Sequence, residues 1–384
     1  MPLERLIKFF TSLRLTVVLL VLSMVLVFAG TLGEVEMGLY KAQTDFFRSF
    51  IVFWQPPGAH WRIPVFPGGY FLGLTLLLNL IAAHLSRFKL TRKKIGLWVI
   101  HAGLILLILG QLSTDLFAVD SQMHLRDGQT KNYSQSERVD ELAVTDVTDK
   151  KLETVVAIPE PLLARQGEIR NARLPFAVRV KQFYANSMLS TNAAPGFARV
   201  TADAGLGSDD LWWRPVPRET ATDRRDAPSA LVQIVTPQGP LGTWLVSDWL
   251  EQPQTFTTPG GRTYQLQLRP ARFYLPFSLT LLKFHHDVYE GTDIPKNYSS
   301  LVTLDNPASG EHRKVLIHMN DPLRYDGRTF YQASFDTDNE GTILQVVKNP
   351  GWLAPYLACG LIATGMVVQF LSHLVPFLRK RRAA

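Results

Sequence analysis

Four stretches of this chain are long and apolar enough to cross a lipid bilayer, which requires about 20 mostly apolar residues. They are residues 15–32, 67–86, 95–114 and 351–378, and none contains Asp, Glu, Lys or Arg. The last three carry one histidine each: His84, His101 and His373. Residues 115–350 lie between the third and fourth stretches and are long enough for a separate domain. The sequence therefore predicts four transmembrane helices, with a large domain between helices 3 and 4.

The overall composition agrees with this division. Hydrophobic residues make up 46% of the chain and charged residues only 19%, which argues against a purely soluble protein. Cys359 is the single cysteine. With one cysteine the chain cannot form an internal disulfide, a Cys-x-x-Cys redox pair, a cysteine zinc site or a covalent haem-attachment motif, Cys-x-x-Cys-His. We expect Cys359 itself to be a small buried residue.

Basic residues gather in the short segments next to three of the apolar stretches. Three precede the first, five lie between the second and third, and four follow the last, against one acid, Glu4. An excess of Lys and Arg marks cytoplasmic segments, so both termini are expected to be cytoplasmic and residues 115–350 to lie outside. The net charge of +7 comes from these segments. Nucleic-acid binding is therefore a poor explanation of the basic composition.

The predicted division follows from these observations. It comprises a cytoplasmic N-terminus (1–14), the first span (15–32), an outer loop with interfacial Trp and Pro residues (33–66), the second span (67–86), a cytoplasmic turn (87–94), the third span (95–114), the outer domain (115–350), the fourth span (351–378) and a cytoplasmic tail (379–384).

Residues 115–350 show the alternation of apolar and polar side chains that is typical of strands. The alternating runs are 176–184, 231–235, 264–268, 277–284 and 343–347. Residues 201–229 are rich in Asp, Arg, Pro, Gly and Ala, and we expect an exposed insertion there. The fold class is membrane α plus β, with a β sandwich or stacked sheets as the outer domain. No phosphate-binding loop, nucleophile elbow or His-Glu-x-x-His motif is present in the sequence.

Six sequence blocks point to a family resemblance. They are Ser12-Leu-Arg-Leu-Thr-Val-Val-Leu-Leu, Gly30-Thr-Leu-Gly, Leu76-Leu-Leu-Asn-Leu, the stretch from Gly96 to Gly110, Tyr289-Glu-Gly-Thr-Asp-Ile-Pro-Lys-Asn-Tyr-Ser-Ser, and His318-Met-Asn-Asp-Pro-Leu-Arg-Tyr-Asp-Gly-Arg-Thr-Phe-Tyr-Gln-Ala-Ser-Phe. These blocks resemble the ResB (CcsB) family of cytochrome c maturation proteins, called system II. The last block is the most specific, and together they extend over essentially the whole chain.

The resemblance implies a subunit of a cytochrome c synthetase in the bacterial inner membrane, with a periplasmic ResB-like domain. Such proteins pair with a membrane protein, CcsA, carry non-covalent haem b across the membrane, and present it to the CxxCH thiols of apocytochrome c. A thioredoxin-like thiol reductant is a further partner implied. The Trp-rich haem-handling segment belongs to CcsA, and Trp212-Trp213 is followed by Arg214-Pro215 here. The chain is thus expected to be a non-catalytic or half-site subunit.

His101 is the leading candidate for a functional residue. An ionisable group inside a membrane span is costly and tends to be functional. His101 lies about 9 Å inside the cytoplasmic end of its predicted helix. Ala102 and Gly103 follow it and would let a helix or a flat ring approach. The residues alone leave two readings open, a haem ligand or a histidine bonded to a neighbouring helix. The resemblance favours an axial haem ligand, with CcsA supplying the second.

The other histidines are weaker candidates. His84 lies at the same cytoplasmic end as His101. Two alternatives are open for it: an interfacial histidine that reaches the headgroups, or a second haem ligand. His285 and His286 are adjacent, so on a strand they point to opposite faces and cannot easily chelate one ion. One of them remains a candidate contact for haem or a partner. The remaining histidines are expected to be interfacial, at the surface or structural: His60, His124, His312, His318 and His373.

Three other classes of function are weighed against the leading one. The alternative is a structural chaperone that binds no haem and docks apocytochrome c or a thioredoxin-like reductant beside CcsA. A small-molecule transporter is disfavoured by the lack of an inverted repeat and of charges in the spans. A hydrolase is disfavoured because no nucleophile and base pair is evident.

Overall fold

The computed structural model divides the chain into two compact units. The first comprises Met1–Val119, Thr220–Thr222 and Lys348–Ala384, and the second comprises Asp120–Glu219 and Asp223–Val347. The structure describes residues 2–56, 58, 61–87, 91, 94–149, 152–208, 210–221, 224–292 and 295–382. His60 and most of the predicted turn at 87–94 lie outside the described residues.

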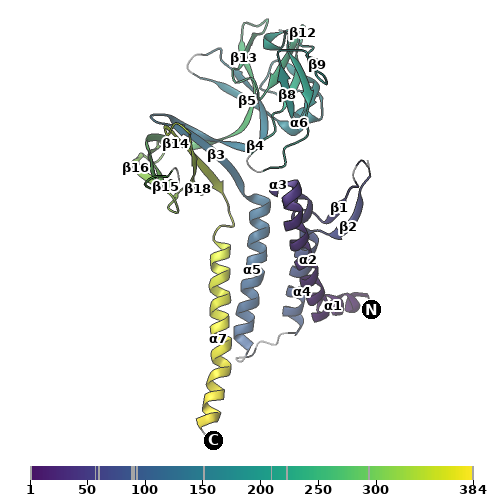
Figure 1. Cartoon of the computed structure of the whole chain (residues 1–384), viewed down its shortest axis with the longest axis vertical. Coiled ribbons are helices and arrows are strands. Elements are labelled where there is room, and N and C mark those ends of the chain that lie inside the picture. Colours follow the sequence, from purple (N-terminus) through teal and green to yellow (C-terminus); the bar gives the residue numbers. More distant parts are fainter. Residues whose placement is uncertain are drawn as a thin grey trace. The chain divides into compact units, whose positions relative to one another are not determined.

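The first unit is built on four helices that are long and apolar enough to cross a membrane (Figure 1). They are α2 (Leu13–Met37), α4 (Gly69–Arg87), α5 (Ile95–Phe117) and α7 (Ala354–Arg382). The shorter elements of this unit are α1 (Pro2–Phe10), α3 (Leu39–Ala42), the π-helical turn η1 (Gln43–Phe47) and a hairpin of β1 (Ile51–Trp54) and β2 (Ile63–Pro67). The predicted fold class, four apolar helices with a large β-rich region between the third and fourth, is confirmed.

Helices α5 and α7 pack through small residues. Gly96, Gly103 and Gly110 recur every seven residues on α5 and are buried. A Cβ atom added to Gly103 would lie 2.7 Å from Cγ1 of Ile362 and 2.9 Å from the carbonyl oxygen of Ala358. The two backbones approach this closely because no side chain separates them, as is common where helices associate in membranes.

Helices α1, α2 and α4 are joined by one buried amide. Asn79 on α4 is 1% exposed, and its Nδ2 donates to the carbonyl oxygen of Phe10 at 2.6 Å. The hydroxyl of Thr16 on α2 donates to Asn79 Oδ1 at 2.6 Å. A buried amide is costly unless it is hydrogen-bonded, so these bonds fix how the helix ends meet.

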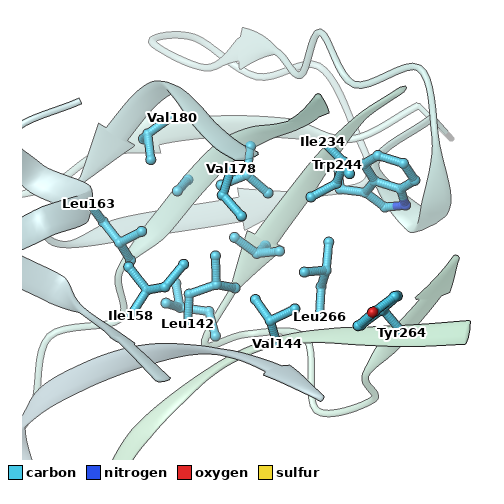
Figure 2. Packing of buried hydrophobic residues seen from close by; sticks show 14 of the residues in the cluster. Leu142, Val144, Ile158, Leu163, Val178, Val180, Ile234, Trp244, Tyr264 and Leu266 are labelled. Carbon is cyan, nitrogen blue, oxygen red and sulfur yellow. The ribbon is translucent and has the colours of Figure 1, made fainter. Parts of the chain in front are cut away.

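The second unit contains two β lobes that share two long strands, β4 (Thr130–Asp146) and β14 (Thr263–Val288). In the first lobe the sheet β12-β11-β7-β6 packs on β5, β4, β14 and β13, forming a sandwich. Its core includes Val178 and Ile234 on one side and Leu142 and Leu266 on the other (Figure 2). The bounds are β5 (Thr154–Pro159), α6 (Glu160–Ala164), β6 (Gly167–Ile169), β7 (Ala177–Tyr184), β11 (Ser229–Thr236), β12 (Gly239–Ser247) and β13 (Gln254–Thr257).

The second lobe is one curled sheet with the strand order β16-β15-β14-β4-β3-β19-β18-β17. Its ends meet, since β16 contacts β17 and β18. The strands enclose a core that includes Phe277, Leu304 and Phe330. The bounds are β3 (Val119–Arg126), β15 (Pro295–Asn306), β16 (Glu311–His318), β17 (Leu323–Tyr325), β18 (Arg328–Phe335) and β19 (Gly341–Lys348).

The runs 264–268 and 277–284 are both strand, as expected, and belong to the single strand β14. Two expectations need correction. The segment 201–229 is not a wholly exposed insertion: β10 (Trp212–Pro215) pairs with β8 (Ser187–Ser190) and β9 (Ala198–Arg199), and Trp213 is 2% exposed. This small sheet covers Leu231 and Leu245 on the outer face of the sandwich. Cys359 is exposed on α7, not buried.

Candidate functional site

His84 and His101 come together between α4 and α5. The two helices are consecutive along the chain and contact each other. His84 lies three residues before the last residue of α4, and His101 lies six residues after the first residue of α5. At about 1.5 Å per residue, both histidines lie within about 10 Å of the helix ends that the predicted turn connects.

The two imidazole rings are in contact. Their centroids are 5.5 Å apart and their planes make an angle of 78°. The ring of Trp98, one turn before His101 on α5, lies 3.7 Å from that of His84 at 66°. Edge-to-face packing is favourable at centroid separations of about 4.5–7 Å, a range that includes the pair of His84 and His101.

The two histidines differ in exposure. His84 is 7% exposed, which does not agree with the expectation of an interfacial residue that reaches the headgroups. His101 is half-buried, and Ala102 beside it is exposed. Gly103 admits α7 rather than leaving an open gap, so one side of α5 is closed by that helix. His101 is the more accessible of the two imidazoles.

The chemistry that this arrangement offers is that of two imidazole nitrogens beside an indole ring. Among the described residues, no group of three or more His, Cys, Asp or Glu side chains could hold a metal ion. The described residues therefore do not form a site that could bind a free metal ion. Haem iron, in contrast, needs only one or two axial ligands from protein, and His is a common one. The donor set fits that group.

The structure separates His285 and His286 on β14. His285 is exposed, whereas His286 is half-buried. The Nδ1 atom of His286 lies 2.9 Å from Asn339 Oδ1, and its ring centroid is 4.3 Å from that of Phe335. The two imidazoles therefore have different surroundings and do not form a pair.

The other described histidines have local partners. His124 and His318 approach carboxylates, with Nε2 2.8 Å from Asp336 Oδ2 and 3.3 Å from Asp321 Oδ2, respectively. On α7, the Nδ1 of His373 lies 2.9 Å from the carbonyl oxygen of Gln369 in its own helix. These contacts are typical of structural or surface histidines.

Two features of the helical unit were not identified from the sequence. Trp98 lies three residues before His101, so helical spacing alone places it on the same face of α5, where it contacts His84. At the other end of α5, Asp115 accepts a hydrogen bond from the hydroxyl of Tyr70 and pairs with Arg48, whose Nε is 2.7 Å from Asp115 Oδ1. This network connects α4, α5 and the segment after η1.

The comparison with protein families bears on the second β lobe. Residues 249–343 match the model of the ResB-like family. The match runs from just before β13 into β19 and includes both of the late sequence blocks, Tyr289–Ser300 and His318–Phe335. This part of the chain is therefore similar to the ResB-like family.

Two curated proteins are similar to the chain over part of its length. NrfI of Wolinella succinogenes is 37% identical over 108 residues, which cover 28% of this chain and 12% of that protein. The cytochrome c biogenesis protein CcsB of Picosynechococcus sp. is 36% identical over 80 residues, which cover 21% of this chain and 17% of that protein. The matched part of the chain covers less than a fifth of the length of either relative.

Proposed function

We propose that this chain is a subunit of a system II cytochrome c synthetase, working with a CcsA-type membrane partner. The observation that carries the proposal is the ResB-like match over residues 249–343. Of the two similar proteins reported above, CcsB is named as a cytochrome c biogenesis protein, and the second is NrfI. The four apolar helices suit a protein that acts at a membrane. We place it in the bacterial inner membrane with the β lobes in the periplasm.

His101 is the residue that we assign to the haem cargo. A neutral imidazole is a common axial ligand of haem iron. His101 is the more exposed member of the pair, and the small exposed Ala102 leaves its side of α5 open to an approaching ring. An ionisable side chain within an apolar helix is otherwise expensive and tends to be functional.

The second axial ligand is assigned to the partner rather than to His84. The rings of His84 and His101 already pack edge to face at 5.5 Å. A macrocycle between them would have to separate α4 from α5, which contact each other, and would expose the buried ring of His84. His84, which packs against Trp98, instead contacts the imidazole of His101 on one side and leaves its other side to meet the cargo.

The proposal is tested by maturation of a reporter cytochrome. The chain is co-expressed with a CcsA-type partner and a CxxCH-bearing apocytochrome c in a bacterial strain that lacks its own maturation system, and covalent haem is measured by haem staining. We expect the wild-type chain to yield holocytochrome and His101→Ala to yield much less at equal membrane abundance. Added imidazole should partly restore the yield, because it can occupy the vacated ligand position.

The matched control is His373→Ala, which removes a histidine from an apolar helix where its hydrogen bonds to described residues are with Gln369 and Ser372 of the same helix. It should mature the reporter at the wild-type level. No covalent haem with the wild-type pair, although both proteins are in the membrane, would contradict the proposed function.

A structural chaperone that binds no haem is the second candidate. The observation that favours it is that the family match covers most of the strands of the second β lobe and leaves out both His84 and His101. In that case the β lobes dock apocytochrome c or a thioredoxin-like reductant, and haem passes through CcsA alone. Normal maturation by His101→Ala, combined with loss of maturation on deletion of the β lobes, would favour the chaperone.

A further inference from the structure

A groove lies beside the C-terminal half of α2, away from the histidine pair. Its cavity has a volume of about 790 Å³, within the size range of ligand pockets. Helix α2 supplies Val25, Leu26 and Ala29, and η1 and the β1–β2 hairpin supply the opposite wall. All of its lining residues belong to the helical unit.

The wall formed by the hairpin is apolar on both of its faces. Val52 and its cross-strand partner Phe66 pack in the cluster that joins α2 and α4. Ile51, Phe53 and Val65 point away from that cluster and remain 45 to 52% exposed. An isolated two-stranded hairpin is at best marginally stable in water, and its unpaired edges are costly in hydrocarbon. This hairpin therefore suits the bilayer interface, where an apolar face meets acyl chains and a strand edge meets water.

The rim of the groove is charged. Lys41 on α3 and Arg62 just before β2 line it, together with a single acid, Asp45. The Nε atom of Arg62 donates to Gln55 Oε1 at 3.2 Å, which orients the guanidinium group. The rim thus has an excess of positive charge beside an apolar floor. This combination complements an amphiphile with an anionic head.

We propose that this groove binds an anionic phospholipid. One acyl chain lies along Val25, Leu26 and Ala29, and the phosphate lies between Lys41 and Arg62. Arginine and lysine bind phosphate oxygens by charge-assisted hydrogen bonds, and basic residues at a membrane surface gain affinity for anionic lipids. The lipid would fill a hollow that the described part of this chain leaves uncovered, and it would fix the hairpin against α2.

The test is native mass spectrometry of the full chain released from nanodiscs. Phosphatidylglycerol is the probe and phosphatidylcholine the comparison lipid. Wild type should retain one phosphatidylglycerol in preference to phosphatidylcholine. Lys41→Gln with Arg62→Gln should raise the apparent dissociation constant for phosphatidylglycerol roughly 25-fold, because each basic residue contributes about a fivefold gain. Arg5→Gln with Lys8→Gln, two exposed bases on α1, should leave retention unchanged.

A second pair of variants tests the groove itself. Ala29→Trp puts a large ring into the cavity and should abolish lipid retention, whereas Val27→Trp, on an exposed face of α2 that does not line the groove, should not. Size-exclusion chromatography confirms that both variants fold. Equal retention by wild type and by the double Gln variant would overturn the proposal. Loss of the lipid when a membrane partner co-purifies on this groove would also overturn it, because the occupant would then be a protein helix.

Discussion

Asp140 is a carboxylate that the sandwich lobe buries almost completely, at 2% exposure. Arg225 donates a hydrogen bond to Asp140 Oδ1, and its Nη2 also lies 3.5 Å from Asp248 Oδ2. Burial raises the pKa of Asp140 to about 6, and Arg225 limits the rise. The pKa of Asp248 is raised by burial as well. A buried carboxylate of this kind connects the stability of the lobe to pH.

The first prediction concerns this group. Between pH 4 and pH 6 the folded chain binds the Asp140 proton more tightly than the unfolded chain, so this contribution to the unfolding free energy falls as pH rises. The substitution Asp140→Asn removes this pH-dependent contribution. The stability of the variant relative to wild type should therefore increase by on the order of 2 to 3 kcal/mol from pH 4 to pH 7. Thermal melts of both proteins in detergent across this range provide the measurement.

Arg225→Gln serves as the companion variant. Because Arg225 lowers the pKa of Asp140, its removal should move the pH-dependent loss of stability to higher pH. A difference between wild type and Asp140→Asn that stays constant from pH 4 to pH 7 would show that Asp140 does not titrate in this window.

For single residues, sequence reasoning identifies the costly groups but not their neighbours. His101 stands out because an ionisable side chain in an apolar span is rare. Its contact with His84, and the contact of His84 with Trp98, depend on how α4 and α5 are rotated about their axes. That rotation is set by packing, including the glycine contact with α7, and hydropathy carries no information about it.

At the scale of elements, α5 and α7 make the most extensive helix–helix contact among the described residues of the helical unit. Gly96 and Gly103 on α5 face Gly365 and Ala358 on α7, with backbone atoms where a Cβ would otherwise lie. The histidine-bearing helix is thereby held against the last helix of the chain. Any side chain added at these glycines must push the two helices apart.

The second prediction follows from this packing. Gly103→Val should destabilise the chain by about 1 to 3 kcal/mol, because its branches meet Ile362 and the Ala358 carbonyl. Gly360→Val on α7 is the matched control, since a Cβ there has nothing within 4 Å. Melting temperatures in detergent compare the two. A Gly103→Val protein as stable as Gly360→Val would mean that α5 and α7 do not pack through Gly103.

The strands show where local pattern stops being informative. Pro270 and Pro276 separate the two alternating runs of β14, and proline usually ends a strand. The strand continues because its register with β4 shifts at Pro270/Arg272 and again at Tyr274/Leu279, which accommodates both prolines. Likewise, the consecutive buried residues Ala230, Leu231 and Val232 indicate a strand covered on both faces, which alternation alone does not predict.

For the whole molecule, hydropathy and charge predict the order of the parts. The four helices and the β-rich region between the third and fourth are found as expected. The division of that region into a sandwich and a curled sheet was not predicted, because it depends on long-range pairing of β4 and β14. The orientation across the membrane follows from the distribution of Lys and Arg and remains a prediction.

The third prediction tests this orientation by cysteine labelling. In a Cys359→Ser background, a cysteine at Ser309, in the exposed turn between β15 and β16, should react with a membrane-impermeant maleimide in intact spheroplasts. A cysteine at Lys380, near the end of α7, should react only after the membrane is opened. Labelling of Lys380→Cys in intact spheroplasts would reverse the proposed topology. The Cys359→Ser chain should itself support cytochrome c maturation, since no second cysteine is available to it.

The most direct test of the central claim, that His101 holds haem, is the reduced absorption spectrum of the chain co-purified with its CcsA-type partner. We predict that wild type and His373→Ala show the same Soret and α bands per mole of protein. His101→Ala should lose most of this absorbance without leaving the complex, and added imidazole should restore part of it. An unchanged spectrum in His101→Ala would contradict the account and would make the contact of His101 with His84 purely structural.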